Sequence, residues 1–269
     1  VIAAMLMFGS IGLFVRGIAL PSSVIALVRG VIGCFFLVTV GSLMKQPVNW
    51  KAVKSNWLVL VLSGAAIGFN WIFLFEAYRY TMVSCATLSY YFAPVFVILV
   101  SPVGTILVSN VLFLDQGENG LIGIFFGLMA AVLYASVMIL NKFMKGLSGL
   151  ETTAAQLGVA AVILLPYTLL TSAEPFSAVL SSVPAVSWIL LAFVGIVHTG
   201  VGYLLYFSAM KKLPAQTVAV LSYIDPVTAI ILSAVILGET MSGPQMAGAV
   251  LILGMTWLGG REPQNKQGN

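Results

Sequence analysis

Two tyrosines are prominent among the polar residues of this apolar chain, because each is followed by a proline three positions later. Tyr91 precedes Pro94, and Tyr223 precedes Pro226. A proline inside a helix removes a backbone N–H and frees a carbonyl group, and in a membrane such groups face protein or a cavity. Each phenol is therefore placed to hydrogen-bond a solute or to satisfy the freed backbone of its own helix.

The single histidine, His198, has a comparable setting. Gly202 and Tyr206 follow it at i+4 and i+8, with Tyr203 beside them. One helix face therefore carries a glycine, which leaves room for a solute, together with polar phenol groups. Ionisable groups at membrane depth usually face the bundle interior or a water-filled path. His198 is a candidate for solute binding or proton transfer, and a neutral imidazole bonded to a backbone carbonyl is the structural alternative.

Two charged residues lie within or beside apolar runs. Asp225 directly precedes Pro226, where it is either a proton or cation site or the cap of the helix that restarts at the proline. Arg29 is suited to neutralising the carboxylate of a solute, or to a structural ion pair with an acid such as Glu76.

Asn70 and Trp71 complete the set of candidate site residues. An amide is costly to leave unpaired in hydrocarbon, so we expect Asn70 to point inward. Trp71, Phe75 and Tyr78 form an i, i+4, i+7 stripe, which is more often a packing or lipid-facing surface than a binding site.

The sequence offers nothing for catalysis, metal binding or nucleotide hydrolysis. One histidine and the separated cysteines Cys34 and Cys85 supply neither a nucleophile–base pair nor metal-ligand spacing. The phosphate-binding pattern G-x-x-x-x-G-K-[ST] is missing. The basic residues are scattered, which argues against nucleic-acid binding. We expect no enzyme, no cofactor and no ATP-driven pump.

Membrane-spanning helices must position these side chains. Of 269 residues, 60% are hydrophobic and 7% charged, and the mean hydropathy is +1.08, whereas a soluble domain carries about 25% charged residues. Apolar runs of about 20 residues have the length of a helix that crosses a bilayer. Such runs lie at 2–20, 24–44, 57–77, 82–101, 120–141, 152–172, 187–208, 216–237 and 244–259, with a shorter one at 103–114. The pairs Gly64/Gly68 and Gly123/Gly127 have the GxxxG spacing of closely packed helices.

The distribution of basic residues predicts the orientation in the membrane. With ten helices and a cytoplasmic N-terminus, nine of the 12 Lys and Arg residues fall on the inside, and Arg16, Arg29 and Arg79 fall on the outside. We therefore expect both termini in the cytoplasm, with residues 261–269 as a tail. The chain begins without Met or a basic leader, so we expect the natural start to lie upstream.

A weak internal repeat divides the chain. Residues 77–94 align without a gap on 209–226 at a shift of 132 positions, and 3–6 align on 130–133. This predicts two five-helix units, 1–114 and 120–260, and an odd number of helices makes the two copies inverted, as in many secondary transporters. The 18 residues 235–252 have no counterpart in the first unit. We expect that the natural chain has most of a fifth helix between Pro102 and Val103.

Several segments in the same order resemble the EamA-type ten-helix branch of the drug/metabolite transporter superfamily. The matching segments are 26–29 (ALVR), 195–209 (GIVHTGVGYLLYFSA), 213–215 (LPA), 221–227 (LSYIDPV) and 237–239 (LGE), with Gly248 and Gly254. The resemblance implies a carrier that moves small organic metabolites, often amino acids outward, through a central cavity open alternately to each side.

We therefore expect an exporter of a small metabolite such as an amino acid, in the lipid bilayer of a bacterial inner membrane. Its transport is downhill exchange, facilitated diffusion or ion coupling, with a proton or counter-substrate as the candidate partner. The expected substrate-binding residues are Tyr91, Tyr223, His198, Asn70, Trp71, Tyr203, Tyr206, Asp225 and Arg29, with helix kinks at Pro94 and Pro226. Phosphorylated or nucleotide-sugar substrates would need several buried basic residues, and drug cations are disfavoured because residues 1–20 hold no carboxylate. A non-transporting membrane subunit is the alternative from another class.

Overall fold

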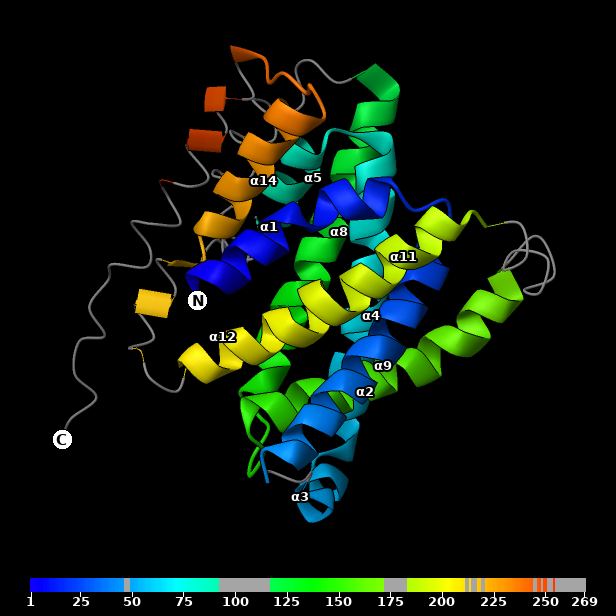
Figure 1. Ribbon diagram of the computed structural model, residues 1–269, viewed down its shortest axis with the longest axis vertical. Helices are drawn as coiled ribbons and strands as arrows, with labels where there is room; N and C mark the ends of the chain where they lie inside the picture. The colour runs from blue at the N-terminus through cyan, green and yellow to red at the C-terminus, as the bar shows by residue number, and fades with distance from the viewer. Residues whose placement is uncertain are drawn as a thin grey trace.

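The computed structural model describes residues 1–45, 49–91, 117–171, 183–210 and 221–243, together with 213, 217–218, 246–247, 249–250 and 254. Over these residues the chain forms helices joined by turns, without a β-strand (Figure 1), which confirms the all-α class. The helices are α1 (Ile2–Arg16), α2 (Ser22–Leu43), α3 (Trp50–Ser55), α4 (Trp57–Tyr80), α5 (Val83–Tyr90), α8 (Gly117–Asn141), α9 (Gly149–Thr171), α11 (Ala185–Phe193), the π-helix η1 (Val194–Val201), α12 (Gly202–Met210) and α14 (Ile224–Ile236).

Five helical stretches of the described chain are long and apolar enough to cross a bilayer. They are Ser22–Leu43, Trp57–Tyr80, Gly120–Asn141, Gly149–Thr171 and Ala185–Ala209. Large apolar side chains project from the outer faces of such helices: Phe35 is 75% exposed, Val162 72% and Leu170 85%. An extended apolar surface of this kind is unfavourable in water and suited to lipid tails.

The apolar runs in the sequence correspond to these helices with altered ends. The run at 57–77 continues to Tyr80 as α4, and the run at 187–208 is one helical stretch with a π-helical centre. The run at 216–237 is not one helix, because a turn at Ser222 and Tyr223 precedes α14.

Other expectations fall outside the described residues. These are the helix kink at Pro94, most of the run at 244–259, the run at 103–114, the break between Pro102 and Val103, and the tail 261–269.

Glycines allow the helices to approach one another closely, as their spacing indicates. A Cβ atom at Gly64 would lie 2.7 Å from Cβ of Val159, so α4 packs directly on α9. A Cβ atom at Gly127 would lie 2.8 Å from Cβ of Ser89, so α8 packs on α5. The GxxxG pairs are therefore packing positions, and they hold the helices that surround the polar centre.

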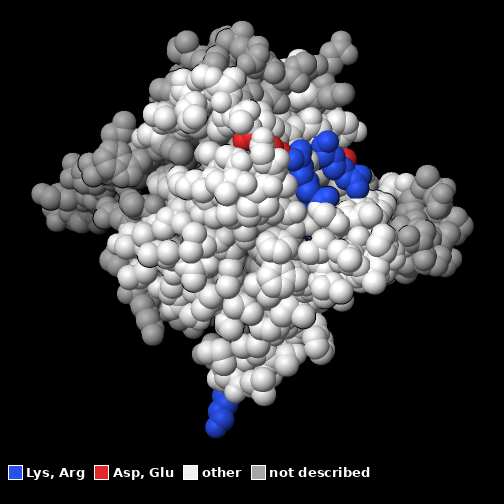
Figure 2. All heavy atoms as spheres, turned by 45° about the horizontal axis from the view of Figure 1, so that its top comes forward, with Lys and Arg blue, Asp and Glu red and all other residues white. Residues whose placement is uncertain are grey.

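Charged side chains gather near the ends of the helical bundle. Figure 2 shows basic side chains beside acidic ones on a largely uncharged face, with further basic atoms at its lower edge. At this end Arg16 pairs with Glu239, and Arg79 pairs with Glu76. The short helix α3, which carries two lysines, lies at the opposite end of the molecule (Figure 1).

Candidate functional site

Arg29 is a buried cation in the second turn of α2, with 4% of its surface exposed. Its Nε donates to Oγ1 of Thr199 at 2.6 Å, and its guanidinium carbon lies 4.0 Å from the centre of the Trp71 ring. No described carboxylate lies within ion-pair distance of it, and Glu76 pairs with Arg79 at 3.7 Å instead. The expectation that Arg29 forms an ion pair with Glu76 is therefore wrong. One hydroxyl and one aromatic face compensate the buried charge only in part, so this guanidinium is a candidate anion site.

The π-helix η1 positions the hydroxyl of Thr199. The Thr199 Oγ1 donates to the carbonyl of Val194 at 3.1 Å, which leaves its lone pairs for Arg29. Helix α2 comes close because Gly33 has no side chain: a Cβ atom there would lie 2.5 Å from Cγ2 of Thr199. Arg29 and Gly33 are one turn apart, so this contact sets the guanidinium beside the hydroxyl. π-Helical turns are rare and often mark functional sites.

His198 lies beside Thr199 in η1 and is 1% exposed. Its Nε2 is 3.0 Å from Oγ of Ser10. Ser10 also donates its hydroxyl to the carbonyl of Met7 at 2.8 Å, and the direction of its hydrogen bond with Nε2 depends on the tautomer of the ring. Nδ1 is buried and has no hydrogen-bond partner of normal geometry in the described part of the chain. Nε2 thus meets a side chain of α1, and the backbone of Phe193 also interacts with the imidazole, as the structural alternative supposes.

A contact between Tyr91 and Asp225 joins the two halves of the chain. Tyr91, at the C-terminal cap of α5, donates its hydroxyl to Oδ2 of Asp225 at 2.5 Å. Asp225 lies in the first turn of α14 and its carboxylate accepts this phenol, so the capping role considered for it is wrong; Tyr223 occupies the cap position. Pro226 also lies in this first turn, where the missing N–H is tolerated. A Cβ atom at Gly9 of α1 would collide with the backbone oxygen of Asp225.

Three tyrosines interact electrostatically with both charged residues. Tyr78 of α4, Tyr90 of α5 and Tyr203 of α12 each lie within electrostatic range of Arg29 and of Asp225. A cation and a carboxylate therefore face one region that is rich in phenol groups. Phenols donate and accept hydrogen bonds, so this region offers polar partners beside both charged residues.

The remaining predicted residues lie around this region. Asn70 is buried as expected, and its Nδ2 donates to the carbonyl of Ala130 at 2.6 Å, which ties α4 to α8. Tyr206 is half-buried, with its ring centre 6.3 Å from that of Phe8. Tyr223 is half-buried at the start of α14.

Sequence reasoning missed three members of this cluster. Thr199 directly follows His198, and Tyr90 directly precedes Tyr91, but neighbours on a regular helix point in different directions and gave no reason to include them. Tyr78 was assigned to a packing stripe. Its adjacency to both charges depends on how α4 lies against α2 and α14, which no spacing reveals.

Helices that are long and apolar enough to span a bilayer, with ionisable side chains in the interior, define an integral membrane protein of the polytopic helical class. Comparison with known proteins narrows this class. The model of the EamA-like transporter family matches residues 121–258. The uncharacterized transporter YxxF of Bacillus subtilis is 31% identical over 271 aligned residues, which cover 93% of this chain and 85% of the relative.

Two further similarities agree. An uncharacterized transporter of Archaeoglobus fulgidus is 30% identical over an alignment that covers 69% of this chain and 70% of that transporter. A probable amino-acid metabolite efflux pump of Salmonella typhimurium shares 34% sequence identity over an alignment that covers 34% of this chain and 30% of the pump. A crystal structure with 18% sequence identity superposes with a TM-score of 0.66 over 97% of this chain and 96% of that chain, which supports the fold alone. The chain belongs to the EamA-like transporter family.

Proposed function

We propose that this transporter is a secondary carrier that exports small zwitterionic metabolites, with amino acids as the first candidates, by alternating access. The observation that carries the proposal is the buried guanidinium of Arg29, which has no acidic partner among the described residues. A solute carboxylate would accept hydrogen bonds from this fork of N–H groups. The solute ammonium would then face Asp225, with phenol groups such as those of Tyr91 and Tyr203 between the two charges.

The charge distribution favours a zwitterion over the two other substrate classes. Of the described basic residues only Arg29 is buried, whereas a phosphate group is usually held by several cations. Helix α1 carries no acidic residue that would bind a drug cation. The Salmonella relative, named as a probable amino-acid metabolite efflux pump, supports the same choice.

We extend the proposal to the architecture. The natural protein would have ten helices as two inverted repeats in a bacterial inner membrane, with both termini in the cytoplasm. The alignment to YxxF is longer than this whole chain, although it covers 93% of it. The relative therefore carries residues that this chain lacks, and we propose that a missing segment lies between Pro102 and Val103.

We further propose that transport is coupled to a proton or to exchange with a counter-substrate. His198 is the candidate proton-handling group, because an imidazole changes charge in the physiological range. Its Nδ1 is buried and makes no hydrogen bond of normal geometry with the described residues.

Reconstituted liposomes test the proposed function directly. The purified protein is given a panel of labelled amino acids, phosphorylated sugars and organic cations, and the movement of each solute is measured with and without a pH gradient. We expect saturable movement of zwitterions. Selective movement of phosphorylated solutes or cations would replace the proposed substrate class, and failure with the whole panel would favour a non-transporting membrane subunit.

A further inference from the structure

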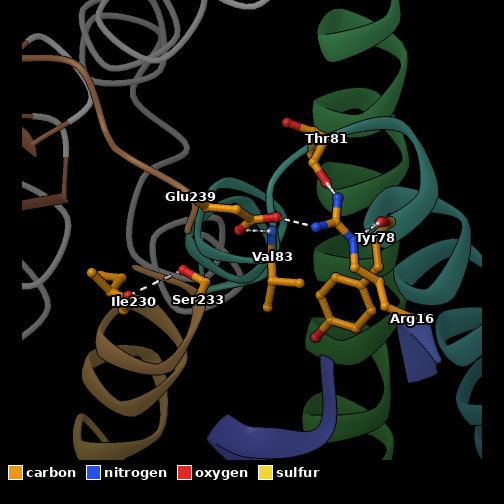
Figure 3. Close-up of polar contacts among 7 residues, drawn as sticks. All are labelled: Arg16, Tyr78, Thr81, Val83, Ile230, Ser233 and Glu239. Carbon is orange, nitrogen blue, oxygen red and sulfur yellow. Dashed lines mark hydrogen bonds and ion pairs between the residues drawn. The ribbon is translucent and has the colours of Figure 1, made fainter. Parts of the chain in front are cut away.

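The residues Arg16 and Glu239 form a contact between the two halves of the chain that the site does not explain. Arg16 is the last residue of α1, and its Nη1 pairs with Oε1 of Glu239. The Nε of Arg16 donates to the carbonyl of Tyr78 at 2.9 Å, and its Nη2 donates to the carbonyl of Thr81 at 3.0 Å. The second oxygen of Glu239 accepts from the backbone N–H of Val83 at 2.9 Å. We call this set of contacts the clasp (Figure 3).

The turn after α14 presents Glu239 to the clasp. Gly238 adopts a left-handed φ of +67°, which ends the helix. The backbone N–H groups of Leu237 and Glu239 both donate to the carbonyl of Ser233, at 3.1 and 3.2 Å. Only 9% of the Glu239 side chain is exposed. The Glu239 carboxylate is held more firmly than one in a simple surface ion pair, because it also accepts the first backbone N–H of α5.

The clasp is a polar contact that holds the start of α5 against the turn after α14. At the other end of the same two helices, Tyr91 donates to Asp225 in the candidate solute site. One face of α1 follows the seam between these helices, since Gly9 touches the start of α14, Gly12 touches Val83 and Arg16 enters the clasp. Positions 9, 12 and 16 are i, i+3 and i+7, so they share one helix face. The Tyr91–Asp225 pair thus closes the seam beside the candidate solute site, and the Arg16–Glu239 pair closes it at the surface.

A cavity of about 320 Å³ lies directly beside the clasp. Its lining residues are Val15, Arg16, Ile18, Phe75, Tyr78 and Arg79. Behind its wall, the guanidinium carbon of Arg29 lies 5.7 Å from the centre of the Phe75 ring. Phe75 and Tyr78 are 0% and 3% exposed and separate the cavity from the buried cation. A volume of this size admits a small metabolite, and Arg16, which lines the cavity, donates to the carbonyl of Tyr78 in its wall.

From this geometry we infer that Arg16 and Glu239 are the gate residues that close the transport path at the end of the bundle where α1, α4 and α14 end. The inference rests on the transport role of the family and not on the identity of the solute. Breaking the clasp removes the contact that ties the turn after α14 to both α1 and α5, because the same carboxylate binds both. Opening the seam there would connect the cavity to the candidate solute site.

Labelling of the native Cys85 tests the gate. Cys85 lies in the first turn of α5, two residues after Val83, and is 1% exposed. In a Cys34→Ser background it is the single thiol, and its reaction with a water-soluble maleimide is timed in lipid nanodiscs, where both faces are accessible. We expect Glu239→Gln and Arg16→Met each to raise the rate about 10-fold, since charge-assisted hydrogen bonds of this kind hold the closed state. The double variant should raise the rate by less than the product of the two single effects, because both substitutions break the shared Arg16–Glu239 pair.

Glu76→Gln is the matched control. It breaks the other ion pair at the same surface, which joins two residues of α4 and links no separate elements. We expect its labelling rate to stay within about twofold of the starting protein, as expected for an exposed pair, and thermal midpoints measured in parallel separate gating from general loosening. Unchanged labelling in both clasp variants, or an equal rise in Glu76→Gln, would overturn the gate.

Glu239→Asp keeps the test decisive if Glu239→Gln yields little folded protein. The shorter side chain retains its charge but cannot span Arg16 and the N–H of Val83 together, so a faster rate supports the gate and an unchanged rate contradicts it. Labelling requires no solute. A protein that moves no amino acid would therefore refute the proposed function while leaving the gate intact. Unchanged labelling of Cys85 in the clasp variants would refute the gate while leaving the proposed function intact.

Discussion

At the residue scale, the centre of this transporter is built from side chains whose charges are only partly compensated. Arg29 has a hydroxyl and the face of Trp71, and Asp225 has the phenol of Tyr91. Burying a charge away from water costs several kcal/mol unless it is paired. A solute that brings one opposite charge to each residue would recover part of that cost, which explains why a protein would retain both groups at membrane depth.

Arg29→Met should abolish much of the solute binding without unfolding the protein. Methionine keeps an apolar stem of similar length and removes the buried charge, so the thermal midpoint should stay level or rise. Hydrogen bonds to charged groups contribute about 1.5–3 kcal/mol, so zwitterion binding should weaken roughly 10- to 150-fold. Binding to detergent-solubilised protein measures this, with the exposed Lys142→Met as the control. Full binding in Arg29→Met would place the carboxylate site elsewhere.

Tyr91→Phe and Tyr223→Phe keep the rings and each delete one hydroxyl. A typical hydrogen bond contributes about 0.5–1.5 kcal/mol, so each variant should bind solute about 2- to 12-fold more weakly while inserting normally. Tyr91→Phe should have the larger effect, because it also removes the partner of Asp225. Transport rates at matched expression measure both. Unchanged rates in the two variants would show that the phenols only pack.

His198→Ala tests proton coupling. If the imidazole relays protons, transport should slow and lose its pH dependence between about pH 5 and 8. Ser10→Ala removes the hydrogen-bond partner of Nε2 but keeps the ring, so it should retain the pH profile. A profile that persists in His198→Ala would leave this residue as a packing contact between α1 and η1.

At the scale of the elements, the close approach of α2 to η1 decides where Arg29 points. The contact depends on small residues on both helices: a Cβ atom at Gly195 would lie 2.8 Å from Cβ of Ile32, and one at Gly200 would lie 2.6 Å from Cδ1 of Phe36. The π-turn widens the helix backbone just where these contacts occur. The two features together explain why Thr199 meets the guanidinium.

Gly33→Ala should separate these elements. The added Cβ would lie 2.5 Å from Cγ2 of Thr199, so α2 or η1 must shift, and overpacking of this kind costs about 1–3 kcal/mol of stability. Gly30→Ala, three residues earlier on α2, meets its nearest atom at 3.6 Å and should be tolerated. Thermal midpoint and solute affinity of the two variants check this. Equal behaviour of Gly33→Ala and Gly30→Ala would refute the close-contact argument.

At the scale of the whole molecule, the described lysines and the clasp arginine lie at opposite ends of the bundle. Helix α3 carries lysines and lies at the bottom of Figure 1, whereas α1, which ends with Arg16, lies in the upper half. This arrangement agrees with the proposed orientation, in which the lysine-rich end is cytoplasmic.

Single cysteines in a background without Cys34 and Cys85 test this orientation. In intact cells an impermeant maleimide should label Arg79→Cys from outside, and should label Lys51→Cys and Gln267→Cys only after the membrane is permeabilised. The reason is the positive-inside bias of the basic residues. Ready labelling of Lys51→Cys from outside would invert the topology.

The sequence by itself determined the helical membrane class and the identity of most polar residues at the centre. Apolar runs long enough to span a bilayer require helices, since every backbone group must be satisfied within the segment. Inside such runs Arg29, Asn70 and His198 had to be buried and partnered, and they are. This information is local, so composition and spacing carry it.

Tertiary structure alone decided which residue each of these meets. Glu76 was the obvious acid for Arg29, but the partner is Thr199, 170 positions away. Asp225 meets Tyr91 at a separation of 134, and Arg16 meets Glu239 at 223. Such pairs arise from how whole helices pack, with glycines allowing close approach at a few points. A helix presents the same face to lipid or protein in many possible arrangements, and only the packed bundle selects one.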